Sequence, residues 1–236
     1  MDSLPSVRMS ANLNSMIRGQ QSIEQADRAI VGGDVAHHVV DPDGALGLDP
    51  LRASTLDAAL EALLASELDG WFLALPVPGS LAPLRGPATF NLAALDEGEA
   101  VVARTAGVGL VPIRVGNAIQ WRIFAAEQPL APSSPHEAER ALNEVVIEAA
   151  ATLSRLDVAA GARPAVAAGV LLAPGYSTRQ RATAERAARL LAACDAALLS
   201  DGASISSFEA ERRAAELRRV RAKAGDALSS AVSWLL

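Results

Sequence analysis

The segment that decides the fold is Ala100–Phe124, which reads AVVARTAGVGLVPIRVGNAIQWRIF. It contains short runs rich in β-branched and aromatic residues, which are separated by Gly107 and by Gly116-Asn117. Glycine and asparagine at such positions are typical of turns between antiparallel strands. The segment therefore predicts a meander of three strands, over residues 100–104, 110–115 and 118–124.

The turn at Gly116-Asn117 leaves two registers open for the last two strands. A two-residue loop would place Val111 opposite Arg122, which sets an apolar side chain against a charged one. A three-residue loop over 115–117 would instead pair Val111 with Trp121. Because a shift of one residue moves every side chain to the other face of the sheet, we expect the second register.

A helix and a further strand precede the meander. Ser54 can cap a helix over Thr55–Leu68 whose leucines share one face, and Gly70 ends that helix. The continuous apolar run Trp71–Leu75 follows and ends at Pro76. Such a run is typical of a strand that is covered on both faces, so we expect it to be the central strand.

The second half of the chain has the periodicity of helices. Ser134 and Glu137, with Pro135 between them, form a strong helix start, and this helix should reach about residue 158. Two further helices are expected over 178–200 and from Ser207 nearly to the end. The last one carries apolar residues three or four positions apart, which predicts the seam of a helical hairpin. These are Leu217, Val220, Ala224, Leu228, Ala231 and Leu235.

Together these elements predict an α+β protein. We expect a small antiparallel sheet of three to four strands, packed helices and a long helical hairpin at the C-terminus. Residues 1–21 lack apolar periodicity and are expected to be disordered. Residues 22–130 should form the α+β body and residues 131–236 the helical region, continuous with the body as one domain.

The composition and the apolar runs indicate a chain with a buried core and without a membrane span. The net charge is −6 and 50% of the residues are hydrophobic, so the chain can bury a core. Cys194 is the single cysteine and lies in an apolar run, which predicts a buried, inert thiol. No apolar run reaches the ~18 residues of a membrane span. With a polar N-terminus, this predicts a cytoplasmic protein; Lys223 as the only lysine indicates a GC-rich genome.

Candidate metal and nucleotide motifs are weak. His37 and His38, with Asp41 and Asp43, are the densest set of metal-binding side chains. Adjacent histidines on an extended chain point to opposite sides, so we predict a polar turn instead of a metal site. The sequence has no phosphate-binding loop, dinucleotide fingerprint or nucleophilic-serine elbow. We therefore predict no cofactor and no metal and assign no catalytic residue, which leans against an enzyme.

The favoured function is a non-enzymatic protein–protein interaction or adaptor protein. It would present its C-terminal helical hairpin to another protein or to a second copy of itself, with no membrane partner. The predicted contact residues are Leu228, Trp234, Leu235, Arg212 and Arg219.

Two alternatives stay open. An enzyme or small-ligand-binding protein would have a pocket between the sheet and the proline-rich loop 76–87, with Arg104, Arg114 or Arg122 as its polar groups. A nucleic-acid-associated factor would use the C-terminal arginines. The acidic net charge and the lack of aromatic residues for stacking on bases make nucleic acid an unfavoured partner.

Overall fold

The computed structural model describes residues 4–81, 83–105, 107–155, 170–199 and 206–234. These residues fall into two compact units, which are described separately. The body contains Leu4–Pro132, Leu171–Ser177 and the chain from Val232 onward, and the helical unit contains Ser133–Val170 and Thr178–Ala231.

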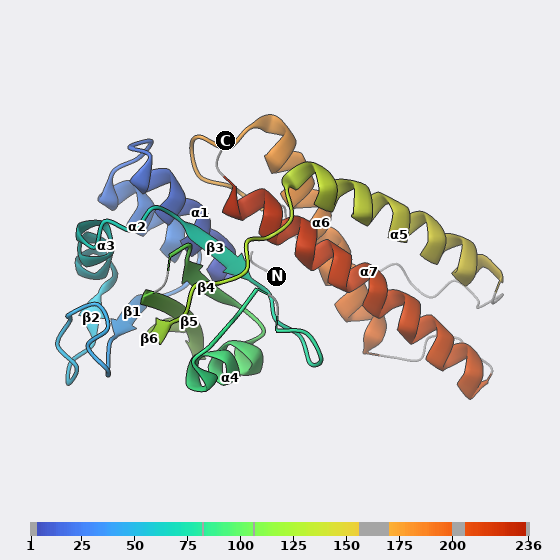
Figure 1. The fold of residues 1–236 in the computed structure, drawn as a ribbon, viewed down its shortest axis with the longest axis horizontal. Helices are drawn as coiled ribbons and strands as arrows, with labels where there is room; N and C mark the ends of the chain where they lie inside the picture. The colour runs from blue at the N-terminus through green and yellow to red at the C-terminus, as the bar shows by residue number, and fades with distance from the viewer. Residues whose placement is uncertain (1–3, 82, 106, 156–169, 200–205, 235–236) are drawn as a thin grey trace. The chain divides into compact units, whose positions relative to one another are not determined.

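The body is built on a six-stranded mixed sheet with the strand order β2-β1-β6-β5-β4-β3 (Figure 1). Strand β1 runs parallel to β6, and the other neighbours are antiparallel. The expected small antiparallel sheet of three to four strands is therefore wrong. The strands are β1 (His37–Val40), β2 (Ser54–Thr55), β3 (Trp71–Ala74), β4 (Ala100–Ala103), β5 (Gly107–Val115) and β6 (Ala118–Ala126).

The two strands that the sequence did not reveal are short. Strand β1 has 4 residues and β2 has 2, which is too few for a periodic pattern. Moreover, β1 pairs with β6, about 80 positions further along the chain, with His37 opposite Ile119. Parallel neighbours need a long connection, so no local turn signal marks this pairing.

The register between β5 and β6 also differs from the expected one. Val111 lies opposite Arg122, and the strands are joined by the two-residue turn Gly116-Asn117. The expectation failed because both faces of the sheet are covered. Val111 faces one apolar layer while its neighbour Leu110 faces the other, so apolar side chains need not share a face. The Arg122 guanidinium extends over the ring of Phe124, 4.9 Å from its centroid.

The apolar run at Trp71–Ala74 is the edge strand β3, and not the central strand. All four of its residues are nevertheless buried. Helix α1 (Pro5–Ile17) packs against this strand, and side chains close its outer edge. The sequence correctly indicated a strand that is covered on both faces, but cover of this kind does not require a central position.

Four helices cover the sheet of the body. Helices α1, α2 (Ile23–Val31) and α3 (Leu56–Ala65) lie over one face, and α4 (Ala88–Glu97) lies over the other (Figure 1). Phe90 of α4 sits directly on Gly109 of β5, where an added Cβ would come within 2.5 Å of the ring. The glycine thus sets how closely α4 approaches the sheet.

Helix α1 corrects the expected disorder of residues 1–21. Every residue from Pro5 to Met16 is buried. Met9, Leu13 and Met16 enter the core, but half of the helix is polar. The buried polar residues are Ser6, Arg8, Ser10, Asn12, Asn14 and Ser15. A helix that buries polar side chains on several sides shows no apolar stripe, and this is why the sequence pattern pointed to disorder.

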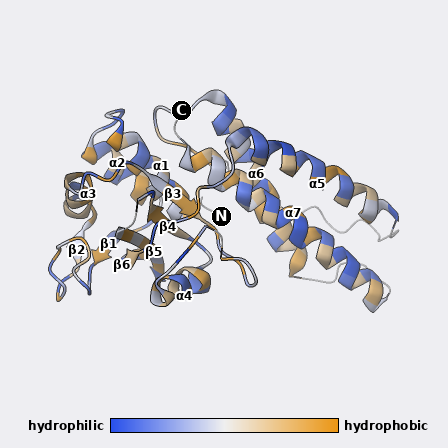
Figure 2. Ribbon diagram, in the orientation of Figure 1, coloured by the Kyte–Doolittle hydropathy of each residue, from blue (hydrophilic) through white to orange (hydrophobic). Residues whose placement is uncertain are grey.

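The helical unit consists of α5 (Pro135–Arg155), α6 (Thr178–Leu198) and α7 (Ser207–Ser233), whose last two residues belong to the body. Side-chain bonds link all three helices: Arg179 to Glu139, Arg219 to Glu148 and Arg221 to Asp195. The predicted hairpin of α6 and α7 therefore has α5 as a third neighbour. Figure 2 shows hydrophilic and hydrophobic residues interspersed along each of these helices. Within the described residues, every helix is too short or too polar to span a bilayer.

The seam of the hairpin matches the periodicity of the sequence. Ala184, Ala187 and Leu191 of α6 are buried, as are Ala224 and Leu228 of α7. Cys194 is buried in the same seam, which confirms the prediction of a packed thiol. Burial raises the pKa of this thiol to about 11, so at neutral pH it is protonated and a weak nucleophile.

Candidate functional site

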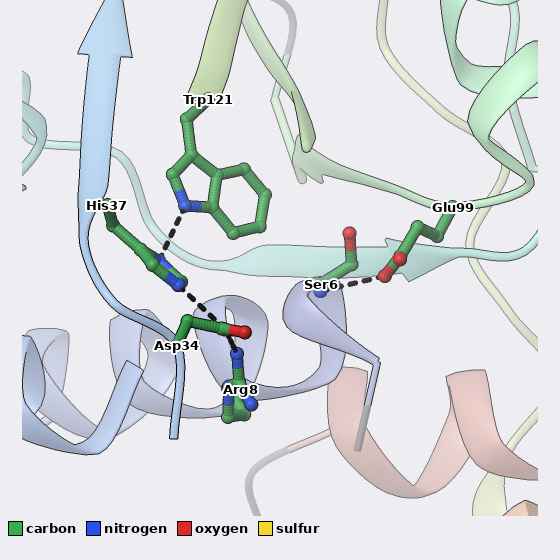
Figure 3. Close-up of polar contacts among 6 residues, drawn as sticks. All are labelled: Ser6, Arg8, Asp34, His37, Glu99 and Trp121. Carbon is green, nitrogen blue, oxygen red and sulfur yellow. Dashed lines mark hydrogen bonds and ion pairs between the residues drawn. The ribbon is translucent and has the colours of Figure 1, made fainter. Parts of the chain in front are cut away.

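A chain of buried polar side chains connects α1 to the sheet of the body (Figure 3). Arg8 of α1 forms an ion pair with Asp34, in the loop before β1. Asp34 is also bonded to Nε2 of His37 at 3.0 Å, and Nδ1 of His37 lies 3.1 Å from Nε1 of Trp121. The Arg8, Asp34 and His37 side chains are at most 10% exposed. Residues far apart in sequence thus meet in one closed network.

The bonding pattern fixes the protonation state of His37. The indole N–H of Trp121 can only donate, so Nδ1 of His37 must accept, and the imidazole proton is on Nε2, facing Asp34. A second proton on Nδ1 would point at the indole N–H. Burial lowers the pKa of His37, and the raising effect of Asp34 does not offset it. His37 is therefore neutral, with both ring nitrogens engaged.

Asp34 is the anion of the network. Burial acts to raise the pKa of its carboxyl group. The hydrogen bond from His37 and the charge of Arg8 outweigh burial, so the pKa lies below its usual value. The carboxylate therefore stays ionised and holds Arg8 on one side and His37 on the other.

A second buried carboxyl group lies at the start of α1. The backbone N–H of Ser6 donates to Oε2 of Glu99 at 2.9 Å, and Glu99 is 8% exposed (Figure 3). A carboxylate at the N-terminus of a helix interacts favourably with the helix dipole. Burial nevertheless raises the pKa of Glu99 to about 7, against the lowering effects of Ser6, Arg114 and Arg8. Glu99 thus changes its charge near neutral pH.

This geometry suits anchoring better than catalysis. Shifted pKa values often mark active sites, but a general base needs a free lone pair that the substrate can reach. His37 has no free ring nitrogen, and its side chain is 0% exposed. The network instead supplies bonds for the polar side chains of a helix that carries little apolar surface. We therefore interpret it as the attachment of α1.

Sequence reasoning did not find this network. His37, His38, Asp41 and Asp43 were predicted to form a polar turn, and no role was assigned to Arg8 or Glu99. In the structure His37 is buried and His38 exposed, so the two histidines do point to opposite sides. The Asp41 carboxylate accepts hydrogen bonds from the backbone of Ala45, Leu46 and Leu48 and so closes a loop. Within the described residues, no group of three or more His, Cys, Asp or Glu side chains could hold a metal ion.

The predicted contact residues lie in different surroundings. Leu228 is 1% exposed and belongs to the packing of the helical unit. Arg212 is exposed; Arg219 is also exposed and pairs with Glu148 of α5 and Glu216 of α7. Trp234 belongs to the body, and Leu235 lies outside the described residues. Within the helical unit, Arg212 and Arg219 are thus exposed, whereas Leu228 is part of the core.

Trp234 is part of an aromatic and cationic cluster in the body. Its ring centroid lies 5.8 Å from that of Phe72, and the Arg104 guanidinium lies 5.1 Å from the Trp234 ring centroid. Such contacts stabilise the local fold by about 0.5–1 kcal/mol each at partly exposed sites. They engage Arg104, which the ligand-binding alternative had assigned to a pocket.

Several arginines of α6 and α7 are bonded to other helices. Arg179, Arg186 and Arg221 contact Glu139, Asn143 and Asp195, respectively. The carboxylates of Glu139 and Asp195 offset the positive charges of Arg179 and Arg221, which a nucleic-acid backbone would need. Contacts between neighbouring helices thus explain why acidic and basic residues are interspersed along these helices.

A shallow depression of about 530 Å³ lies beside the proline-rich loop 76–87. It is lined by Arg85, Glu127, Gln128, Pro129 and Leu130. Arg104, Arg114 and Arg122 are not among the lining residues. The polar groups expected to converge on a ligand are therefore elsewhere in the body.

Comparisons with known proteins give a family. A model of the Rv1486c-like protein N-terminal domain matches residues 6–138, which is more than half of the chain. The chain belongs to the Rv1486c-like family. A second model, of the Rv1486c-like C-terminal domain, matches residues 136–229. No curated protein and no solved structure matches the chain. The two Rv1486c-like domains meet close to Ser133, where the helical unit begins.

Proposed function

We propose that this Rv1486c-like protein is a non-enzymatic interaction protein, whose helical unit presents one end of the α6–α7 hairpin to another protein. The observation that carries the proposal is the exposure of two large apolar side chains at that end. Leu199, just after α6, is 89% exposed, and Phe208, in the first turn of α7, is 70% exposed. Both lie next to the connection between the two helices.

Charge adds to this apolar surface. Arg212 is exposed and follows Phe208 by four positions, so the two side chains share one face of α7. Aromatic and arginine side chains are the residues that most often dominate binding energy at protein interfaces. Burying a Leu or Phe side chain contributes about 1.5–3 kcal/mol. This pair beside an arginine therefore has the composition of the energetic centre of an interface.

Two features of the body also support this proposal. Its buried titratable groups bond to one another, as in Arg8–Asp34–His37, and the depression near loop 76–87 is shallow and open. Arg219, one of the predicted contact residues, is engaged with Glu148 and so contributes to helix packing. We expect the protein to act in the cytoplasm, with another protein or a second copy as its partner.

The test is affinity capture from the native cells with three versions of the tagged full-length protein. These are the wild type, the double variant Leu199→Asp/Phe208→Asp, and the control Leu92→Asp. Leu92 is 61% exposed on α4 of the body, so the control makes the same chemical change elsewhere. We expect the wild type and the control to retain one defined protein that the double variant loses. Equal retention by all three, or no retained protein, would contradict the proposal.

A further inference from the structure

The outer edge of β3 is closed by side chains in place of a neighbouring strand. Strand β3 is the last strand of the sheet, and it pairs with β4 on its inner side only. In an antiparallel pair, alternate residues direct their backbone groups to the neighbour, so Trp71 and Leu73 direct theirs outward. An edge of this kind normally presents unpaired N–H and C=O groups.

Asn14 of α1 makes both hydrogen bonds that a neighbouring strand would make to Trp71. The Trp71 N–H donates to Oδ1 of Asn14 at 2.8 Å, and Nδ2 of Asn14 donates to the Trp71 carbonyl at 2.9 Å. A side-chain amide has the same donor and acceptor as a peptide group. Asn14 is 5% exposed, so these bonds are shielded from water.

Ser233 replaces a neighbouring strand at Leu73, the next residue of β3 whose backbone groups face outward. Its Oγ accepts a hydrogen bond from the Leu73 N–H at 2.9 Å. The carbonyl of the preceding residue, Val232, accepts bonds from the Tyr176 hydroxyl and from Nδ2 of Asn14. Asn14 and Ser233 are therefore connected through Val232 in one arrangement along the edge.

The strand itself is short, with 4 residues, which limits pairing with another chain. It lacks the charged side chains, proline and bulges that protect many other edges, because it reads Trp71-Phe72-Leu73-Ala74 and keeps a regular register against β4. Its protection is the cover supplied by Asn14 and Ser233. We propose that these two side chains replace a seventh strand, and that the edge they close is a latent pairing site for a second copy of this chain.

A second copy is the partner that this edge fits. Two identical antiparallel edges related by a two-fold axis present matching donors and acceptors to each other. Because β3 is apolar on both faces, a second β3 would extend both apolar layers of the sheet. Pairing requires both α1 and Ser233, at the end of α7, to leave the edge. The inference does not rest on the proposed function of the helical unit.

The first test compares Asn14→Asp with Asn12→Asp in the full-length protein. Aspartate at position 14 keeps the acceptor for Trp71 but loses the donor to its carbonyl. Asn12 is also buried in α1, yet its Nδ2 bonds to Arg8 of the same helix, so the control makes the same change away from β3. We expect the amides of Trp71 and Leu73 to exchange at least about tenfold faster in Asn14→Asp than in the control. We also expect a larger dimer fraction by analytical ultracentrifugation at equal concentration.

A second pair of variants, with smaller changes to the side chain, tests the proposal if Asn14→Asp does not fold. Ser233→Ala removes the acceptor for the Leu73 N–H, whereas Ser230→Ala removes a buried hydroxyl that bonds to Ser133 in the helical unit. We expect more dimer with Ser233→Ala than with Ser230→Ala. Equal dimer fractions in every folded variant and its control would overturn the proposal.

Discussion

The body and the helical unit are each stabilised internally by a different kind of interaction. The ion pair in the body between Arg8 and Asp34 is at most 10% exposed. In the helical unit, the Arg179 and Arg219 side chains are 64% and 53% exposed in their ion pairs, and the buried seam is made mainly of alanine and leucine residues. Buried charges are costly to leave unpaired, whereas exposed pairs contribute little. The two regions should therefore respond very differently to the loss of a charge.

The largest effect is expected for Asp34→Ala. This change leaves Arg8 buried without its anion and removes the acceptor for His37. Breaking a buried pair in this way costs about 3–5 kcal/mol. Urea unfolding should show this loss, and Glu24→Ala serves as a control because its pair with Arg28 is exposed. An Asp34→Ala protein as stable as the control would contradict the anchoring role.

Leu228→Ala should be nearly as costly, through packing alone. The side chain is 1% exposed in the seam of the helical unit, and removing a buried leucine costs about 2–5 kcal/mol. Thermal unfolding followed by circular dichroism would measure this. If the change were without effect on stability, Leu228 would not belong to the core of the bundle, and its predicted role as a contact residue would be restored.

The pH dependence of stability should separate Glu99 from His37. The folded pKa of Glu99, about 7, is above its usual 4.5, so the folded state binds a proton more tightly than the unfolded state. The carboxyl group therefore contributes more stability as pH falls from about 8 to 5, by up to about 3 kcal/mol. Glu99→Gln should be more stable than the wild type at pH 8 and should lose this dependence.

The same variant reveals the opposite contribution of His37. Its folded pKa is below the usual 6.5, so the unfolded state takes up the proton first and stability falls as pH drops below 6.5. Urea midpoints of Glu99→Gln between pH 8 and 5 should therefore decline on acidification. A curve for Glu99→Gln that still rises on acidification would mean that another group is responsible.

The smallest effect is expected for Glu148→Ala. Its pair with Arg219 joins side chains that are 60% and 53% exposed, which water and salt screen. The urea midpoint should stay close to that of the wild type. A large loss would show that this pair holds α5 and α7 together, and would remove the contrast between the two regions.

The difference between the helical unit and the body also explains what the sequence could predict. Local signals were reliable: Ser134 and Glu137 form the predicted capping bonds, and the seam of the hairpin follows the apolar periodicity. Predictions failed where distant contacts decide. The pairing of β1 with β6 and the burial of Asn14 against Trp71 depend on residues that are far apart in the chain. A buried polar helix such as α1 looks disordered until its partners are known.

The candidate site shows the same limit. Arg8, Asp34, Glu99 and Trp121 come from separate segments, so no spacing in the sequence joins them. For the helical unit, the sequence indicated contact residues at the C-terminal helices. It could not show that Leu228 is buried while Phe208 is exposed, because both lie on one long helix and only packing with α5 and α6 distinguishes them.

The most direct test of the closed network is nitrogen NMR of the His37 imidazole in the folded protein. The structure predicts a neutral ring at pH 7 with its proton on Nε2, and a pKa below the ordinary value, because burial disfavours the charged ring and Trp121 donates to Nδ1. A ring that takes up its second proton near the ordinary pKa of about 6.5 would contradict this account and point instead to an open, reactive histidine.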